Sequence, residues 1–384
     1  MNKFDRPRIA HVNFCPSIGV YKKIAGQAKA AEHAGLNMDF FILTDQKLPS
    51  ASNLKIIPFN WPKNFFKRKF AQNFLTFNII NKMTDLKVYD RIILRYPTAV
   101  DISFKDFINA YNGRFITEHH ADVIGELRVL EQGVLNPIRI FLENRNAPKV
   151  LSKSCGIIGV TEEIRQIYLE KCVGEKASTT IPNGIDVDSI PFSKFQQLNQ
   201  LFLNLLFVST TFYAAHGLDR LLKGLIQYRG HKTINLTLVG KIYRGEELGL
   251  LKSINNSKVI IKYHDRLYGE ELDVIFSQAH LAVSTLALFR DGLSQASPLK
   301  TREYTARGLP FIYAYDDMDL NENLDFCYKI PINTEPVNIE DIVHFSEKKC
   351  SQHNVAKTMR DYATEKMDWS HKMKKMYNFA ISTM

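Results

Sequence analysis

Short apolar runs alternate with amphipathic segments along most of the chain, and this alternation sets the expected fold. Apolar runs bounded by turn residues predict buried strands, whereas apolar residues that recur with a period of about 3.6 predict helices. Parallel sheets flanked by helices produce this alternation. In the first half, the pattern predicts a helix over residues 20–33 and strands over residues 8–14, 38–44, 53–58, 91–96, 114–117 and 156–160.

The second half repeats the alternation more regularly after a polar stretch at residues 187–200, which we interpret as a linker. A chain of 384 residues is expected to form two domains. We therefore predict an α/β fold of two doubly wound, Rossmann-like domains that face a ligand cleft. In this half the pattern predicts helices over residues 217–228, 246–254 and 270–279 and strands over residues 204–209, 234–239, 259–263, 281–288 and 311–315.

Residues 288–310, between the last two of these strands, combine a short helix with several cations. Ser297 suits the N-cap, Pro298 suits the first helical position, and Gly308 ends the helix. Glu303 falls on the inward face, where a carboxylate needs a partner. Because the start of a helix attracts anions, the stretch is expected to hold a phosphorylated ligand. The nearby cations are Arg290, Lys300 and Arg302.

Aromatic and basic residues concentrate in one segment that runs from Trp61 to Ile80. Two interpretations stay open. The segment is either a core-facing helix with a solvated basic face or a surface helix that rests on anionic lipid or holds a lipid-linked acceptor. The apolar stripe comprises Phe66, Phe70, Phe74, Phe77 and Ile80, and the cations near its start are Lys63, Lys67, Arg68 and Lys69.

The formal net charge of +10 favours anionic partners, such as nucleotides, phosphorylated lipids or a membrane surface. No compact basic motif supports nucleic-acid binding, and no Gly-x-Gly-x-x-Gly after the first strand supports a dinucleotide-dependent oxidoreductase. The five cysteines are scattered without metal-ligand spacing, which is typical of a reducing compartment. We see no signal peptide and no run of about 18 apolar residues, so we expect a cytoplasmic protein that at most binds the inner membrane face peripherally.

The phrase Ser-Pro-Leu-Lys-Thr-Arg-Glu-Tyr-Thr-Ala-Arg-Gly-Leu-Pro, from Ser297 to Pro310, resembles a helix of the retaining glycosyltransferases of family 4, of the capsule and lipopolysaccharide type. Weaker similarities extend over nearly the whole chain. The resemblance implies GT-B architecture with domains at residues 1–190 and 191–360 and a C-terminal helix at residues 361–384 that returns to the first domain. It also implies that Glu303 binds the ribose hydroxyls of a nucleotide sugar and that neither metal nor other cofactor is needed.

Two positions depart from the family's pattern. Gln295 stands where the family has a glutamate that contacts the donor sugar, and an amide carries no charge to stabilise a positive anomeric carbon. His216 stands where a lysine that neutralises the diphosphate is typical. Other groups are then expected to contact the donor. They are the side chains of Arg290, Lys300, Lys241 and Arg302, the hydroxyls of Ser209 and Thr210, and the backbone N–H groups at Gly292 and Leu293.

Two elements of the first half complete the resemblance. Gly19 is similar to the glycine of the family's loop after the first strand, where a small residue lets the sugar or acceptor approach, although an ordinary turn explains it equally. Thr117-Glu-His-His120 resembles the family's Thr-x-His element, which implies that His119 faces the donor sugar. His120 is the alternative, and Glu118 is expected in solvent or in a salt bridge.

Together these features predict a glycosyltransferase that moves a sugar, with retention, from a nucleotide sugar to a hydroxyl of a glycan or lipid-linked acceptor in surface-polysaccharide assembly. His119 and Gln295 are the expected catalytic residues, and no metal is expected. Gln295 and His216 keep an alternative open, namely a non-catalytic protein that binds nucleotide sugars within a glycan-assembly complex.

Overall fold

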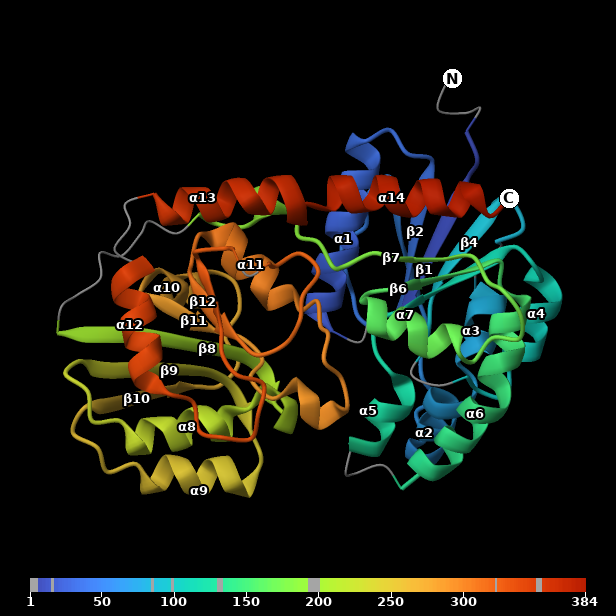
Figure 1. Ribbon diagram of the computed structural model, residues 1–384. Helices are drawn as coiled ribbons and strands as arrows, with labels where there is room; N and C mark the ends of the chain where they lie inside the picture. The colour runs from blue at the N-terminus through green and yellow to red at the C-terminus, as the bar shows by residue number, and fades with distance from the viewer. Residues whose placement is uncertain are drawn as a thin grey trace. The chain divides into compact units, whose positions relative to one another are not determined.

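The computed structural model describes residues 6–14, 17–83, 86–97, 100–129, 134–192, 201–321, 323–349 and 354–384. The chain forms two compact units (Figure 1). Unit 1 comprises Met1–Asp186 and Trp369–Met384, and unit 2 comprises Val187–Asp368. The chain thus passes between the units after Asp186 and again after Asp368, whereas the sequence predicts passages after residues 190 and 360.

Unit 1 is built on a seven-stranded sheet whose neighbouring strands all run parallel. Its order is β3-β2-β1-β4-β5-β6-β7, so the chain fills one side of β1 before it starts on the other. The strands are β1 (Ile9–Phe14), β2 (Met38–Thr44), β3 (Leu54–Pro58), β4 (Arg91–Arg95), β5 (Phe115–His119), β6 (Gly156–Gly159) and β7 (Ser178–Thr180).

Helices cover both faces of this sheet (Figure 1). On one face α1 (Ile18–His33) packs against α14 (Trp369–Ser382), and Gly26 leaves room for the indole of Trp369. A Cβ at Gly26 would lie 3.1 Å from Trp369 Cδ1. The other face carries α2 (Phe65–Phe74), α3 (Thr76–Met83), α4 (Phe104–Tyr111), α5 (Val123–Val129), α6 (Asn136–Lys153) and α7 (Glu162–Leu169).

The last helix confirms the expectation that the C-terminal segment belongs with the first domain. Trp369, Met373, Met376 and Ala380 form one stripe, and all four are buried in the core of unit 1. Truncating such a buried aromatic residue to alanine typically lowers stability by about 3–5 kcal/mol. α14 is therefore a structural part of unit 1.

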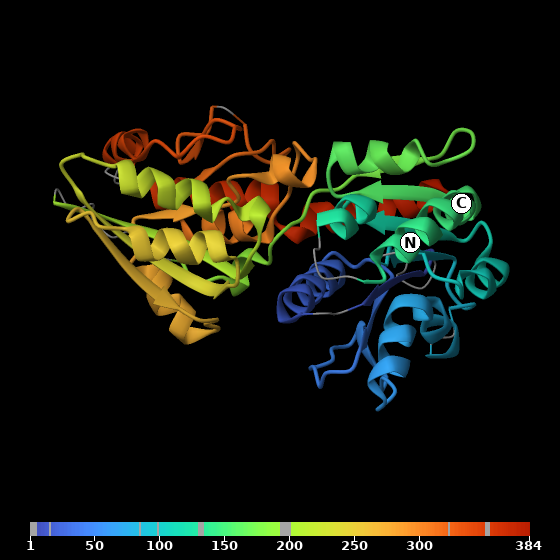
Figure 2. The ribbon, with the colours of Figure 1, turned by 90° about the horizontal axis from the view of Figure 1, so that it is seen from below.

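Unit 2 contains a six-stranded sheet in the order β10-β9-β8-β11-β12-β13, again with parallel neighbours. In Figure 2, the helices after β8 and β9 lie on one side of this sheet and the helix after β10 lies on the other. The strands are β8 (Phe202–Phe212), β9 (Thr233–Ile242), β10 (Val259–His264), β11 (Leu281–Val283), β12 (Phe311–Tyr313) and β13 (Cys327–Lys329). The helices are α8 (Leu218–Gln227), α9 (Gly245–Ser253), α10 (Glu270–Ser277), α11 (Leu299–Arg307), α12 (Ile339–Lys349) and α13 (Val355–Tyr362).

The aromatic segment from Trp61 to Ile80 divides into two helices rather than one. α2 ends at Phe74 and α3 starts at Thr76, because Leu75 leaves the helical conformation with ψ of 24°. The second part of the stripe faces the core, with Phe77 and Ile80 at 0% exposure. The first part faces outward, with Phe66 80% exposed. The second half of the segment is therefore core-facing, whereas the first half is a surface helix whose contact with lipid or a lipid-linked acceptor remains a prediction.

Candidate functional site

The sheet of unit 2 has a topological switch point between β8 and β11. From β8 the chain builds β9 and β10 on one side and then returns to place β11 on the other. Ligands of open parallel sheets bind outside the carboxyl ends of the strands at such a point. The two loops that leave these ends are joined, since Leu286 N–H donates to His216 O at 3.1 Å and Ala287 N–H donates to Ala215 O at 3.0 Å.

His216 lies in this loop as a neutral, oriented hydrogen-bond donor. The N–H of Tyr213 donates to Nδ1 of His216 at 2.9 Å, so the ring proton of the neutral imidazole is on Nε2. Nε2 lies 3.4 Å from Oγ of Ser209, and that hydroxyl donates to Thr211 O at 2.7 Å. Burial lowers the pKa of His216 well below its usual range, and the nearby charge of Lys300 lowers it further. His216 therefore does not supply the positive charge of the lysine it replaces.

A β-bulge places Ser209 and Thr210 beside the loop. The register between β8 and β9 shifts between Val208 and Thr211. Opposite the bulge, Gly240 has φ of 128°, and a Cβ there would lie 1.7 Å from Ser209 O. Only glycine permits this approach. Thr210 is exposed, and its carbonyl accepts a hydrogen bond from Nε of Arg266 at 2.9 Å.

Lys300 supplies the positive charge of this site. It lies in the first turn of α11, and its Nζ is buried without a hydrogen-bond partner among the described residues. Nζ lies 5.5 Å from the ring centroid of Phe207. Burial lowers the pKa of Lys300 to about 8. Buried charges in proteins are normally paired, so the surroundings of Lys300 favour an anion.

The start of α11 differs from the sequence-based expectation. Pro298 is the N-cap, the helix begins at Leu299, and no side chain caps it. The expected N-cap Ser297 lies one residue before the cap. The start of a helix attracts anions, and Lys300 lies in this first turn, so the start of α11 suits an anionic ligand.

Arg290 and Arg302, two of the expected cations, are held by carboxylates of unit 2. Arg290 forms two hydrogen bonds to the buried Asp219, at 2.7 and 2.8 Å, and a third to Ala214 O at 2.9 Å. Arg302 is fully buried and pairs with Asp317 and Asp319. Arg290 thereby fixes the loop around the site. Arg302 is already neutralised by its two carboxylates, so it is not available to bind an anionic ligand.

The remaining donor-side residues lie at the same edge of the sheet. Gly292 uses its N–H for a bond of 3.0 Å to Phe289 O, whereas the N–H of Leu293 makes no hydrogen bond among the described residues. Lys241 lies near the carboxyl end of β9, in register with Thr211, and no hydrogen bond or ion pair of its side chain occurs within the described part of the chain. Leu293 and Lys241 are therefore available to a ligand.

Glu303 and Gln295 flank this edge. Oε1 of Glu303 accepts hydrogen bonds from Nε and an Nη of Arg307, at 3.0 and 2.7 Å. The Glu303 side chain is 29% exposed, and its Oε2 has no hydrogen-bond donor among the described residues. Gln295 forms an isolated parallel bridge with Asp316, which follows β12. Gln295 therefore lies at the carboxyl end of β12, whereas Glu303 lies in the second turn of α11, and the contacts of both with a donor remain a prediction.

In unit 1, His119 is enclosed by aromatic rings. It is 1% exposed, its ring stacks on Tyr168 with centroids 3.6 Å apart, and Tyr96 lies 4.4 Å away. Nε2 of His119 lies 2.9 Å from Oγ1 of Thr117. Burial holds the pKa of His119 well below its usual range. The described structure therefore gives His119 a packing role, and its predicted contact with a sugar has no further support.

The neighbouring residues form a polar cluster that the sequence interpretation missed. Glu118 is buried, and its Oε2 lies 2.9 Å from Nε2 of His11 and 3.2 Å from Nε2 of His120. Nζ of Lys23, on α1, lies 3.3 Å and 3.2 Å from the two ring nitrogens of His120. Glu118 is thus buried against the rings of His11 and His120 and not in solvent. The sequence evidence for this cluster was the presence of two polar residues, Lys23 and Gln27, on the otherwise apolar side of the helix α1.

Gly19, the expected acceptor-side glycine, lies inside the first turn of α1 rather than in a loop before it. The residue is exposed, and a Cβ there would meet only Oγ of Ser17, at 3.9 Å. The space around Gly19 therefore does not require glycine. The preceding Cys15 and Pro16 lie outside the described residues.

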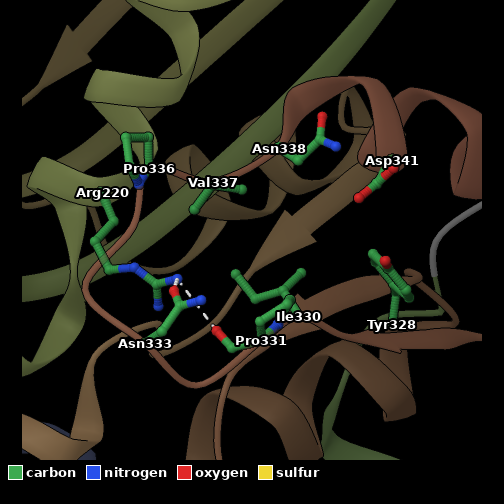
Figure 3. A pocket seen from close by; sticks show the side chains of 9 residues that line it. All are labelled: Arg220, Tyr328, Ile330, Pro331, Asn333, Pro336, Val337, Asn338 and Asp341. Atoms are coloured by element: carbon green, nitrogen blue, oxygen red, sulfur yellow. Dashed lines mark hydrogen bonds between the residues drawn. The ribbon is translucent and has the colours of Figure 1, made fainter.

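A hollow on unit 2 lies beside the buried Arg220 (Figure 3). The guanidinium donates to four acceptors, which are the carbonyls of Leu286, Pro331 and Glu335 and Oδ1 of Asn333. Arg220 therefore ties the loop after β11 to the loop after β13. Because its donors are already used, this hollow is not the anion site.

Membrane-spanning helices and metal-binding clusters are both absent from the described residues. No helix there is long and apolar enough to cross a membrane. Within the same residues, no group of three or more His, Cys, Asp or Glu side chains is placed to hold a metal ion.

Comparison with solved structures identifies the fold. The chain is 15% identical to sucrose-phosphate synthase from Thermosynechococcus elongatus, with a TM-score of 0.71 over 98% of this chain and 99% of that chain. It is 12% identical to HepE from Anabaena in complex with UDP and glucose, with a TM-score of 0.60 over 99% and 100% of the two chains. The fold is GT-B. The lipopolysaccharide outer core galactosyltransferase WaaB, in its apo form, gives a TM-score of 0.58 at 12% identity over 98% and 100%.

The GT-B fold agrees with the architecture predicted from the sequence, two Rossmann-like units with parallel sheets. No family model matches the chain, and no curated protein matches it. At these identities the likeness establishes the fold alone.

Proposed function

We propose that this chain is a glycosyltransferase that moves a sugar from a nucleotide-sugar donor to a hydroxyl group of a glycan or lipid-linked acceptor. The observation that carries the proposal is the unpaired Nζ of Lys300 at the switch point of unit 2. The GT-B neighbours support the same function, because one of them, HepE, was solved with UDP and glucose.

The geometry of unit 2 suggests how such a donor would bind. Lys300 would lie against the diphosphate with the hydroxyl of Thr210 as a further donor, and Ser209 and His216 would take part only by giving up their present hydrogen bonds. The free Oε2 of Glu303 would accept from the ribose hydroxyls. Gln295 would hydrogen-bond the sugar without contributing charge.

In the transfer step, the bond between the anomeric carbon and the phosphate oxygen breaks, and the acceptor oxygen bonds to that carbon. The departing nucleoside diphosphate gains negative charge, which the ammonium of Lys300 stabilises in a site of low dielectric constant. We infer from the family resemblance that the departing phosphate takes the proton of the acceptor on the same face, which gives retention. No metal is part of this proposal.

The cellular setting belongs to the same proposal. We infer that the protein is cytoplasmic, that its acceptor belongs to surface-polysaccharide assembly, and that unit 1 binds an anionic membrane surface. The exposed Phe66 and Phe70 on α2, next to Lys67 and Lys69, support the membrane contact. WaaB, whose name places it in lipopolysaccharide synthesis, is among the structural neighbours.

Binding and transfer are tested separately. Thermal unfolding is measured with UDP, GDP and ADP, and transfer is then measured with the sugars of the nucleotide that stabilises the chain. Lys300→Gln is expected to lower kcat/KM about 100-fold, as loss of one charge-stabilising group does elsewhere. Lys252→Gln, at an exposed lysine of α9, is the control and should retain activity. Equal activity of the two variants would contradict the role of Lys300.

The second candidate function is a non-catalytic protein that binds nucleotide sugars. Gln295 and the neutral His216 favour it, since neither supplies the charge usual in the family. Gln295→Glu distinguishes the two. If the parent protein shows no transfer and the Gln295→Glu variant does, the non-catalytic function is supported. Robust transfer by the parent protein rejects it.

A further inference from the structure

The sheet of unit 1 has its own topological switch point, between β1 and β4. α1 starts at the carboxyl end of β1, and Arg95 is the last residue of β4. His120 directly follows β5, the next strand along. By the rule that locates ligands in open parallel sheets, this edge is the expected binding crevice of unit 1. The polar cluster of Lys23, Glu118 and His120 lies at that edge.

Lys23 is an ammonium group without a carboxylate of its own. The residue is 7% exposed, and its Nζ lies 3.2 and 3.3 Å from the ring nitrogens of His120. No ion pair within 4.0 Å joins it to a carboxylate of the described residues. A neutral imidazole does not compensate a buried positive charge. Lys23 therefore resembles Lys300 in lacking a counter-ion.

Lys23 faces charged and polar groups from several elements. Glu118 on β5 is the one carboxylate beside it in the described structure, and His11 on β1 and His120 share that carboxylate. Arg95 on β4 adds a second positive charge, and the Trp369 ring of α14 lies 5.7 Å from Nζ. Burial and Arg95 lower the pKa of Lys23 to about 7, although Glu118 opposes them.

A second observation points to a polar ligand or water at this place. Gln27 lies one turn after Lys23 on the same face of α1. It is 0% exposed, and both its Nε2 and its Oε1 lack a hydrogen-bond partner. Nδ1 of His11 is buried and unpartnered as well. Buried polar atoms without partners are rare and normally meet a ligand or an ordered water.

We propose that Lys23 is an anion-binding residue of unit 1 and takes an oxyanion, phosphate or carboxylate, carried by the acceptor. The acceptor part of this inference rests on the proposed glycosyl transfer, whereas the anion site does not. Since an anion favours the protonated amine, binding is stronger below about pH 7 than above it. The acceptor class is accordingly an acidic glycan or a phosphate-linked one.

The indole of Trp369 beside Lys23 offers a local readout. The chain has two tryptophans, so Trp61→Phe leaves Trp369 as the only one. Sulfate is the probe, because its charge is constant across the pH range used, and sodium chloride of equal ionic strength is the reference. We expect a saturable change of Trp369 emission at about pH 6 and at least about tenfold weaker binding at about pH 8.5, where Lys23 is neutral.

Two further substitutions in the Trp61→Phe chain decide the result. Lys23→Gln is expected to weaken sulfate binding at least tenfold, whereas Lys22→Gln, at the exposed neighbouring lysine, changes net charge equally and leaves it intact. Lys23→Arg retains the charge and should bind. No saturable change in the parent, or equal binding by the Lys23→Gln and Lys22→Gln chains, would overturn the proposal. Vesicles of phosphatidylglycerol in place of sulfate show whether a lipid-borne phosphate gives the Lys23-dependent change instead.

The acceptor part has its own test. Once a donor is known, transfer to methyl glucoside is compared with transfer to methyl glucuronide, which differs by one carboxylate. Lys23→Gln should raise KM for the glucuronide at least tenfold and leave the glucoside unchanged; equal effects on both would reject it. Because the fluorescence measurement needs neither donor nor turnover, failure of the anion site and failure of glycosyl transfer are distinguishable.

Discussion

Lys300 combines a cost in stability with a use in binding. Its ammonium group is buried without a counter-ion, and folding lowers its pKa from 10.5 to about 8. The unfolded chain therefore holds this proton more tightly than the folded chain. As a result, the contribution of Lys300 to the free energy of unfolding rises as the pH increases from about 8 to 10.5, and its full cost is present below pH 8.

Replacing Lys300 should therefore stabilise the protein while impairing its site. We expect Lys300→Met to raise the free energy of unfolding at pH 7 by about 1–2 kcal/mol, which includes a discount for partial solvent access. The same variant should lose most of the stabilisation that a nucleoside diphosphate gives the parent. Urea denaturation with and without UDP measures both effects. A destabilised Lys300→Met variant would show that Lys300 has a counter-ion in solution.

At the residue scale, the sequence indicated which residues lie at the end of a strand, but not towards which face of the sheet each side chain points. Thr-Glu-His-His was recognised at the end of a strand, but the alternation of a strand turns Thr117 and His119 to one face and Glu118 and His120 to the other. Which face is packed with Tyr96 and Tyr168 depends on residues far away in the sequence. The ion pairs of Arg302 with Asp317 and Asp319 likewise could not be predicted from the sequence pattern, because the fold brings these residues together.

At the element scale, the apolar stripe between Trp61 and Ile80 is divided between α2, where part of it is exposed, and α3, where it is buried. The stripe continues past Leu75, but the helix axis does not, so Phe77 enters the core while Phe66 stays outside. Periodicity gave no indication of this break, because the apolar spacing is unchanged across it. The strands β7 and β13 also escaped prediction, because Ser-Thr-Thr and Cys-Tyr-Lys form no apolar run, unlike the equally short β11 and β12.

Substitutions on the two helices should therefore separate stability from surface binding. Phe77→Ala is expected to lower the free energy of unfolding by about 3–5 kcal/mol. Phe66→Ala should change it by less than about 0.5 kcal/mol but weaken binding to vesicles that contain phosphatidylglycerol. Denaturation and co-sedimentation measure the two effects. If Phe66→Ala binds such vesicles as well as the parent, the proposed membrane contact of α2 is wrong.

At the scale of the whole molecule, the fluorophores report one unit only. Trp61 and Trp369 both belong to unit 1, and unit 2 has no tryptophan. Each unit has its own buried core. We expect UDP, whose proposed contacts lie in unit 2, to raise the thermal midpoint followed by circular dichroism more than the midpoint followed by tryptophan fluorescence. Equal shifts in both signals would mean that the units unfold as one cooperative block.

The overall architecture could be predicted from the sequence because it depends on an alternation of strands and helices that is repeated many times. An error in one predicted element does not change the fold class. Two parallel sheets were expected from that alternation, whereas α4, α5, α6 and α7 of unit 1 were not predicted. The candidate site depends instead on a few contacts without periodicity. The pairing of His216 with Ser209 and the isolation of Lys300 and Lys23 arise from contacts that follow no pattern along the chain, so the sequence gives no sign of them.

The return of the chain to unit 1 has a consequence for synthesis on the ribosome. Every residue of unit 2 is translated after Asp186 and before Trp369, so α14 is made only after unit 2 is complete. Until then, the face of α1 that holds Gly26 lacks the indole that covers it, and the core of unit 1 is open. We therefore expect unit 2 to fold first during translation. Unit 1, although most of it is made first, can complete its core only when α14 has been translated. Until then its apolar face is available to chaperones.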